Sequence, residues 1–564
     1  MKELYIELMD RVLDAYSIEH IKAYTDDVIK NGLSEHGFPR LTANLGILIA
    51  HGRRGGLKDD FLKMMDLCCK EIPIALPKNG PSVGNDFSVK EIIFCLLEIE
   101  RAGVFEKSVT DGWRKELAKI EPHSTYTVIA PVPVLPTVYI GNWAAFGAAS
   151  EQVRKYAGIG DESDFIENQI QSQLYNFDEN GMYRDPGEPI VYDMVTRLQL
   201  AVALYFGFDG SCRTQLEAEM MKSVDKTLEM MSVTGEIPFG GRSNQFLHNE
   251  AFYAALCEFY ASVLKKQGDI KKAGMFKRAA KIATESIVPW LNETEIHHIK
   301  NYYATDSKYG CEDYAYFDKY MVTTGSWLYL AYIMADDSID ETECPAENGS
   351  YICETTQYFH KVLYKYKDYF VEYDTNADMH YDASGLGRIH KKGAPSAICL
   401  SVPFAQTPNY GVDITNPSPL SICGGIKTDD GFVYAFDKRA EYKLLEKKIT
   451  DSYAEVKFEC REDNNILFYE TCKLSDIGVE ISVEGEGELE ILFPIFDFDG
   501  KNYTEKNISE KLAEVTYKGY KCSYTTDGVI TDKNTVYANR NGHYKAAVAC
   551  GKNSITLKVD IQKV

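Results

Sequence analysis

The spacing of apolar residues changes once along the chain, near residue 350. Before that point apolar side chains recur three and four positions apart, which is the spacing of one face of an α-helix. The pattern predicts about ten to twelve helices with almost no strand between them. The clearest are at 3–16, 59–71, 89–102, 144–157, 165–175, 193–208, 213–231, 250–266, 270–288 and 325–334.

Long polar loops separate these predicted helices in pairs. They lie at 77–87, 121–142, 177–192, 234–244 and 301–316, and they alternate with short connections. In a ring of helical hairpins, long loops on one side would line a common cleft. We therefore predict an (α/α) toroid, with a helical bundle or solenoid as the alternative.

Beyond residue 350 the apolar period shortens to two, and β-branched and aromatic residues become frequent. Strands are predicted at 369–373, 396–402, 431–436, 454–460, 466–474, 479–483, 489–493, 515–522 and 554–559. Strands at this density, separated by Gly and Asn/Asp turns, predict an antiparallel β-sandwich. We expect a toroid domain over 1–345 and a sandwich domain over 346–564, joined through an acidic loop at 336–350.

The charge of the chain excludes several kinds of partner. Its 84 acidic and 61 basic residues give a net charge of −23, and no basic tract is present. This argues against nucleic acid and anionic membranes as partners. No apolar run reaches about 18 residues, and acids interrupt the first ten positions, so we expect no signal peptide and a cytoplasmic protein.

The 14 cysteines lie in apolar contexts without metal-ligand spacing. They indicate buried, reduced thiols, and we expect neither a metal nor a cofactor. A homo-oligomer is left open.

One loop is unusually rich in hydrogen-bonding side chains. Six of them crowd the transition from loop to helix at 242–250: Arg242, Asn244, Gln245, His248, Asn249 and Glu250. A helix start presents free N–H groups and a positive dipole end, so anionic or hydroxyl-rich ligands bind well there. A merely capped helix start is the alternative reading.

The other long loops supply further candidates for a cleft. Asn85 and Asn142 each lie at a predicted helix start, and Trp143 beside Asn142 is a possible stacking wall for a sugar ring. Tyr192 belongs to the third loop. The fifth loop carries several tyrosines with acids between them and no apolar period, and its candidates are Tyr302, Tyr309 and Tyr314.

Two chemistries fit these residue types. β-Elimination from a uronate requires neutralisation of the carboxylate, a base for the α-proton and an acid for the leaving oxygen, and Asn, His, Arg and Tyr can supply them. A glycosidase requires two carboxyl groups flanking the bond. Its candidates are Asp86, Asp193, Glu250 and Glu312, each of which has an alternative role as a cap or ion-pair partner.

A helical first half with polar aromatic loops, followed by an all-β second half, resembles the heparinase II/III-like and alginate-lyase-like polysaccharide lyases. The resemblance implies that an Asn or His on a toroid loop neutralises the carboxylate and that a later Tyr acts as acid or base. It also implies a histidine from the β domain, here His390 or His380. The sequence departs from the family in the inverted order His248-Asn249. The segment at 180–193 is also similar to α/α-toroid proteins that include glucuronidase-like hydrolases.

Together these observations predict a lyase that cleaves a uronate-containing oligosaccharide or glycoside by β-elimination. The predicted catalytic residues are His248, Asn249, Tyr302, Tyr309, Tyr314 and His390. The predicted substrate-binding residues are Asn85, Asn142, Trp143, Tyr192, Arg242, Asn244, Gln245, Glu250 and Arg388. An α/α-toroid hydrolase with an Asp/Glu pair and a non-catalytic glycan-binding protein are the alternatives.

Overall fold

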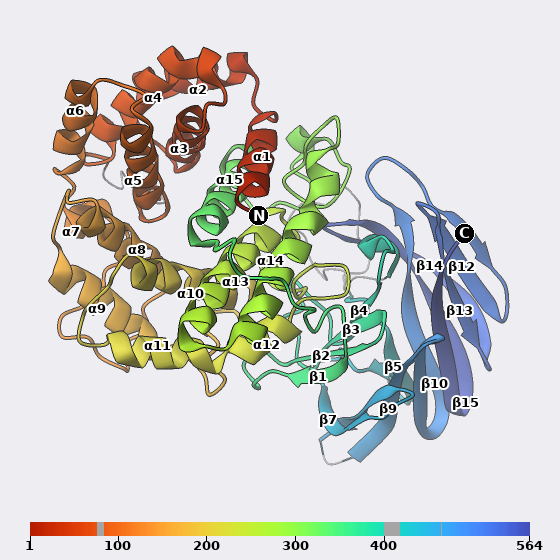
Figure 1. Ribbon diagram of the computed structural model, residues 1–564. Helices are drawn as coiled ribbons and strands as arrows, with labels where there is room; N and C mark the ends of the chain where they lie inside the picture. Colours follow the sequence, from red (N-terminus) through yellow and green to blue (C-terminus); the bar gives the residue numbers. More distant parts are fainter. Residues whose placement is uncertain (76–83, 400–417, 464) are drawn as a thin grey trace.

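The computed structural model describes residues 1–75, 84–399, 418–463 and 465–564. Its first part is helical and its second part consists of antiparallel sheets (Figure 1). The α-helices are α1 (Lys2–Leu13), α2 (Ile18–Asn31), α3 (Gly37–Ala50), α4 (Lys58–Glu71), α5 (Asn85–Ala102), α6 (Lys107–Leu117), α7 (Pro122–Thr125), α8 (Trp143–Tyr156), α9 (Ser163–Leu174), α10 (Ile190–Tyr205), α11 (Arg213–Lys222), α12 (Val224–Glu229), α13 (His248–Gln267), α14 (Ile270–Leu291) and α15 (Phe317–Met334).

Six of these helices form a closed inner ring. Each packs on the next in the order α3, α5, α8, α10, α13 and α15, and α15 returns to α3. Further helices cover the ring from outside: α1 packs on α15, α4 on α3, α9 on α8 and α14 on α13. This is the predicted (α/α) toroid.

The burial of an inner helix explains part of what the helix prediction missed. The pattern identified ten segments that are helical here, but it missed α2, α3, α6 and α7, and it merged α11 with α12. Every residue of α3 except Ala50 is buried. A helix that is apolar all round has no polar face, so its sequence carries no three-and-four alternation.

The strands form two sheets. The first is four-stranded, in the order β1 (Ser350–Glu354), β2 (Lys361–Tyr366), β3 (Tyr369–Asp374) and β4 (Gly385–Lys391). The second contains β5 (Cys423–Thr428), β6 (Gly431–Tyr434), β7 (Ala440–Ile449), β8 (Ala454–Glu462), β9 (Asn465–Ser475), β10 (Gly478–Phe498), β11 (Glu505–Ile508), β12 (Leu512–Tyr517), β13 (Tyr520–Thr526), β14 (Val529–Asn539) and β15 (Gly542–Lys563). Its main path is β11-β12-β13-β15-β10-β9-β8-β7.

The small sheet is a middle layer between the helices and the large sheet. All residues of β2 and β3 are buried. Because side chains alternate along a strand, Leu363 and Phe370 join the helical core, whereas Tyr364 and Val371 join the sandwich core. The helices end at Met334 and the strands begin at Ser350, so the predicted boundary at 345/346 falls between them.

Four of the predicted strand segments differ from the structure. Segments 479–483 and 489–493 belong to one strand, β10, which carries a register shift between Glu484 and Glu488. Segment 515–522 is the β12–β13 hairpin. Ser396–Cys399 is a short 3₁₀ helix, and 400–402 lie outside the described residues.

The thirteen cysteines whose side chains the structure describes are all free, and all but Cys550 are buried. Within the described ranges, no helix is both long and apolar enough to cross a membrane. In the same ranges, no group of three or more His, Cys, Asp or Glu side chains is arranged to hold a metal ion.

Candidate active site

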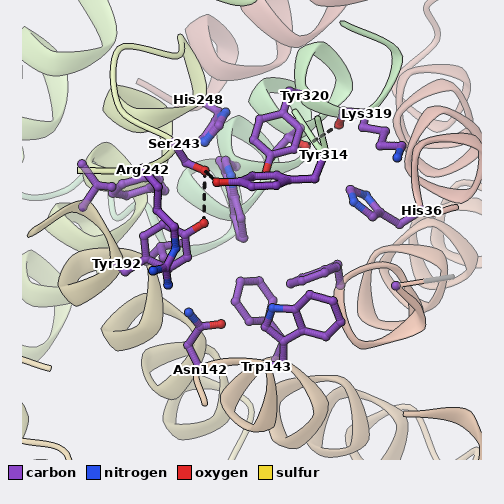
Figure 2. Close-up of a pocket in the computed structure, with 18 of the residues that line it drawn as sticks. His36, Asn142, Trp143, Tyr192, Arg242, Ser243, His248, Tyr314, Lys319 and Tyr320 are labelled. Carbon is purple, nitrogen blue, oxygen red and sulfur yellow. Dashed lines mark hydrogen bonds between the residues drawn. The ribbon is translucent and has the colours of Figure 1, made fainter. Parts of the chain in front are cut away.

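A cavity of about 650 Å³ opens where the six inner helices begin. Its lining includes residues from the first turns of five of these helices and His36, which directly precedes α3. The inner helices therefore present their N-terminal ends to one space (Figure 2). Helix N-termini carry partial positive charge, so this arrangement favours an anionic group in the cavity.

Ser243 lies at the centre of a hydroxyl cluster on the cavity wall. Its Oγ is 3.0 Å from the Tyr314 hydroxyl and 3.1 Å from the Tyr192 hydroxyl, as Figure 2 shows. Its backbone is left-handed, with φ of 57°, and Gln245 two positions later has φ of 65°. Non-glycine residues in this region are strained by about 1–3 kcal/mol, and such strain is found mostly at functional sites.

A buried ion pair holds Ser243 in this conformation. The Ser243 N–H donates to Glu312 Oε1 at 2.8 Å. Both oxygens of Glu312 accept from Arg540, with Nη1 at 2.6 Å from Oε2. Arg540 is fully buried and lies in the turn between β14 and β15. The β domain therefore contributes to the geometry of the toroid site.

A second polar cluster centres on buried Asp185. Its carboxylate accepts from Asn142 Nδ2 at 2.8 Å, from the Tyr139 hydroxyl at 3.1 Å, and from Arg242. The Arg242 guanidinium also lies over the Tyr192 ring, 4.4 Å from its centroid. The charge of Arg242 is therefore already compensated by Asp185.

His248 begins α13 and lines the cavity with 7% of its surface exposed. Its ring stacks on Phe246 and contacts the edge of Tyr320, with centroids 5.4 and 5.2 Å away. Burial, together with the positive charge of Arg40 nearby, lowers the pKa of His248 well below its usual value. The imidazole is neutral at neutral pH and can accept a proton.

The phenols on the same wall retain their protons. Desolvation inside the cavity, followed by the neighbouring Tyr192 and the Glu312 carboxylate, raises the pKa of Tyr314. Desolvation likewise raises the pKa of Tyr320. The wall therefore pairs a neutral imidazole with protonated phenols, as acid–base chemistry near neutral pH requires.

Aromatic side chains form the opposite wall. Phe87 packs edge-to-face on Trp143 and Phe146, with centroids 4.7 and 4.8 Å apart. Trp143 and Asn142 lie across the cavity from Tyr314 and Tyr320 (Figure 2). Such a wall suits the apolar face of a sugar ring.

Seven of the predicted site residues line this cavity. They are Asn142, Trp143, Tyr192, Arg242, His248, Asn249 and Tyr314. Both side-chain polar atoms of Asn249 are engaged within the loop, because Nδ2 donates to the Ser243 carbonyl at 3.1 Å and Oδ1 accepts from the Phe246 N–H at 2.9 Å.

The remaining predicted residues are not in the cavity lining, and several of them join the two domains. Tyr309 donates to the carbonyls of Asn539 and Gly542, and Gln245 Oε1 accepts from Asn541. Tyr302 pairs with Lys518. Arg388 Nη2 donates to the Ile237 carbonyl at 2.8 Å, and His390 Nδ1 lies 2.9 Å from the Ser232 hydroxyl.

The last three support loops or helix starts inside the toroid. Asn85 Nδ2 donates to the Ile72 carbonyl at 3.3 Å, and Asn244 Nδ2 donates to the Pro238 carbonyl at 2.8 Å. Glu250 pairs with Lys300 at 2.7 Å. His380, the other β-domain candidate, is exposed on the loop after β3 and lines a separate groove.

The carboxylates proposed for a hydrolase are engaged elsewhere. Asp86 accepts the N–H groups of Thr127 and Val128, Asp193 pairs with Arg197 at 2.6 Å, and Glu250 and Glu312 have the partners described above. None of the four is in the cavity lining. The site therefore lacks the predicted carboxyl pair.

Several cavity residues were not singled out from the sequence: Ser243, Lys319, Tyr320, His36, Arg40 and Asp185. Lys319 and Tyr320 lie in the first turn of α15, whose predicted start at 325 was too late. Arg40 belongs to the missed helix α3, and His36 is the residue directly before that helix. The glycines before Ser243 were the available signal for an unusual backbone at that position.

The sequence matches no protein family profile, and no curated protein resembles it. Solved structures do share its architecture. A heparan sulfate lyase HepC mutant from Pedobacter heparinus superposes with a TM-score of 0.50 and 10% identity, over 94% of this chain and 76% of that one. A chondroitin AC lyase mutant from Streptomyces coelicolor A3 gives a TM-score of 0.44 and 10% identity, over 98% of this chain and 82% of that one. The first likeness confirms the predicted fold of toroid plus sandwich, and the neighbours found are polysaccharide lyases.

Proposed function

We propose that the protein is a carbohydrate lyase that cleaves a uronate-containing oligosaccharide or glycoside by β-elimination. The observation that carries this proposal is the wall on which a neutral histidine and a protonated tyrosine share one cavity. Tyr314 is hydrogen-bonded to Ser243, and His248, which also lines the cavity, contacts the edge of Tyr320. The fold it shares with a heparan sulfate lyase supports the same class of reaction.

In the proposed reaction the uronate carboxylate lies among the helix N-termini, near Lys319. Electrostatic stabilisation there favours the enolate-like intermediate. The imidazole of His248 takes the proton from C5. The C4–O4 bond then breaks, a C4=C5 double bond forms, and the Tyr314 phenol gives its proton to the departing oxygen. Proton return from His248 to Tyr314 closes the cycle, and no water is consumed.

The assignment uses part of the predicted set. Tyr314 is preferred to Tyr302 and Tyr309 because it lines the cavity, whereas those two contact the β domain. Neither amide is assigned as the neutralising group, because both amide atoms of Asn249 are bonded within the loop and Asn142 Nδ2 donates to Asp185. Arg242 orients Asp185 and hence Asn142.

The test is the ultraviolet absorbance of the unsaturated uronate, followed during incubation with uronate oligosaccharides. Tyr314→Phe and His248→Ala are each expected to lower kcat by about 10²- to 10⁴-fold while substrate binding is retained. Tyr316→Phe, in the same segment but outside the cavity lining, is the matched control.

Two results would reject the proposal. Release of sugar without the chromophore would indicate a hydrolase. Binding of uronate oligosaccharides by the parent protein without any turnover would indicate a glycan-binding protein.

A further inference from the structure

We infer that the substrate is a short, unsulfated uronide that places a single negative charge in the cavity. This inference rests on the proposed function, because it names the substrate class of the same site. It separates this protein from enzymes built for sulfated polymers, and it follows from the charges, walls and size of the cavity.

The first argument is the supply of positive charge. Among the residues that the structure describes, three side chains that line the cavity are lysine or arginine. Arg40 is buried and its Nε lies 3.2 Å from Glu91 Oε1, while Arg242 is paired with Asp185. Lys319 has no carboxylate within 4 Å among the described residues, and its charge acts on the Glu35 carboxylate from farther away. One cation is thus left for a ligand.

The two histidines add little to this supply. His36 and His248 both line the cavity, and burial lowers the pKa of each well below the usual value. Both are neutral at neutral pH. Apart from Asp185, which is paired with Arg242, the described carboxylates that line the cavity are those of Glu35 and Asp313, and they oppose a second anionic group.

Helix dipoles point to where the single anion lies. Four of the six inner helices carry an acidic residue in the first turn, which counters the positive end: Asp86 in α5, Asp193 in α10, Glu250 in α13 and Asp318 in α15. Only α3 and α8 have none among the described inner helices. In Figure 2 Lys319 and His36 lie on the same side of the cavity, whereas Asn142, at the start of α8, lies on the opposite side. The anion is therefore placed beside Lys319, at the start of α3.

The walls and the volume set the remaining properties of the ligand. Phe87, Trp143 and Val195 face the cavity as partly exposed apolar side chains. A sulfate packed against such a wall would lose hydration without gaining a partner. Pockets of about 300–1,000 Å³ hold ligands of drug size, so this cavity accommodates two or three sugar rings.

The test compares uronate oligosaccharides of two to four sugars that share one backbone, with and without O-sulfate groups. Elimination is followed by ultraviolet absorbance. We expect kcat/KM to be at least about tenfold higher for the unsulfated member of each pair. Equal or faster cleavage of the sulfated member would overturn the inference and leave the lyase proposal intact.

If no uronide is cleaved, the lyase proposal fails, and the same pairs are compared by calorimetric titration. Tighter binding of the unsulfated member would then still support the inference, and tighter binding of the sulfated one would overturn it.

Variants test the role of the single cation. Lys319→Gln is expected to raise KM for the unsulfated substrate by about tenfold or more, with Lys319→Arg restoring most of the loss. Lys308→Gln is the control, because Lys308 lies over the Tyr316 ring and outside the cavity lining. Unchanged KM in Lys319→Gln would contradict the assignment. Asp313→Asn removes a carboxylate at the cavity. It is expected to reduce the ratio of kcat/KM for the unsulfated substrate to kcat/KM for the sulfated one.

Discussion

At the scale of single residues, Ser243 combines a strained backbone with a central hydrogen-bonding role. Its φ of 57° is a conformation that glycine adopts freely and serine adopts at a cost. The preceding Gly240 and Gly241 also have positive φ. A serine occupies this position although a third glycine would relieve the strain, which points to a role for the hydroxyl between Tyr192 and Tyr314.

Replacing Ser243 by Gly and by Ala separates the two effects. Both variants lose the hydroxyl, so both are expected to lower kcat. Gly also relieves the left-handed strain, so Ser243→Gly should have a free energy of unfolding about 1 kcal/mol higher than Ser243→Ala. Urea denaturation and steady-state rates measure the two quantities. An unchanged kcat in both variants would show that the hydroxyl has no part in the reaction.

The neutral state of His248 predicts a pH profile. Its pKa in the folded protein lies well below 6.5, so protonation of the proposed base begins only well below that pH. The ratio kcat/KM should therefore stay level as the pH falls from 8 towards 6.5 and decrease only in more acidic buffer. An acidic limb centred at or above pH 6.5 would contradict the role of His248 as the base.

At the scale of elements, the turn between β14 and β15 contacts the loops that form the site. Arg540 binds Glu312 and Gly310, its carbonyl accepts from Asn301, and Asn541 reaches the Lys300 carbonyl at 3.2 Å. Part of the loop 301–316 therefore packs against this turn of the β domain. This contact explains why the loop contains tyrosines but no apolar period.

Removal of one partner from the Arg540–Glu312 pair tests this contact. Arg540→Gln leaves a buried carboxylate unpaired and is expected to cost about 3–5 kcal/mol of folding free energy. Arg540→Lys keeps the charge but cannot form the two-pronged contact, so it should lower kcat while costing less stability. Arg439→Gln, at an exposed ion pair of the same domain, should change the free energy of unfolding by less than about 1 kcal/mol. Full activity in Arg540→Lys would contradict the positioning role.

The sequence allowed the fold class to be predicted, because amphipathic outer helices and alternating strands carry clear periods. It also identified the loop around His248 and the helix start at Asn142. It could not distinguish Tyr314 from Tyr302 and Tyr309, since the contacts of Tyr302 with Lys518 and of Tyr309 with the β14–β15 turn are with residues about 200 positions or more away in the sequence. His390 was predicted as a site residue from the resemblance alone. In the structure it is hydrogen-bonded to Ser232 at the domain interface.

At the scale of the whole molecule, the four-stranded sheet belongs to two cores. Leu363 packs with the helices and Tyr364 packs with the large sheet, although they are neighbours in β2. We therefore expect the helical and β domains to unfold in one cooperative transition.

Leu363→Ala is expected to cost about 2–5 kcal/mol and to lower the unfolding temperature of both domains together. Calorimetry, with near- and far-ultraviolet circular dichroism as separate probes, checks this. Leu445→Ala, at an exposed position of β7, should change stability by less than about 0.5 kcal/mol. Two separate transitions would show that the domains are independent.

The interface also predicts how stability depends on pH. Although burial opposes its charge, His360 has its pKa raised to about 9 by Asp374 of β3 and by Glu188 of the helical domain. A raised pKa stabilises the folded state fully below 6.5 and loses that contribution as the pH rises towards 9. The loss should approach about 3 kcal/mol. In His360→Gln the free energy of unfolding should change much less between pH 6.5 and 9 than in the parent protein. The variant His380→Gln, at an exposed position, should show the same pH dependence as the parent protein.

The ion pair between Arg540 and Glu312 also affects the order of events during synthesis. The two residues are 228 positions apart. At a translation rate of about 5–20 residues per second, Glu312 emerges roughly 10–50 s before its partner is made. Until then the carboxylate has no arginine to neutralise it, and the Ser243 loop lacks the contact that holds its strained backbone. The nascent toroid therefore passes through a period in which its site loops are incomplete, and the arrangement of the candidate site forms only after the last long hairpin has folded against them.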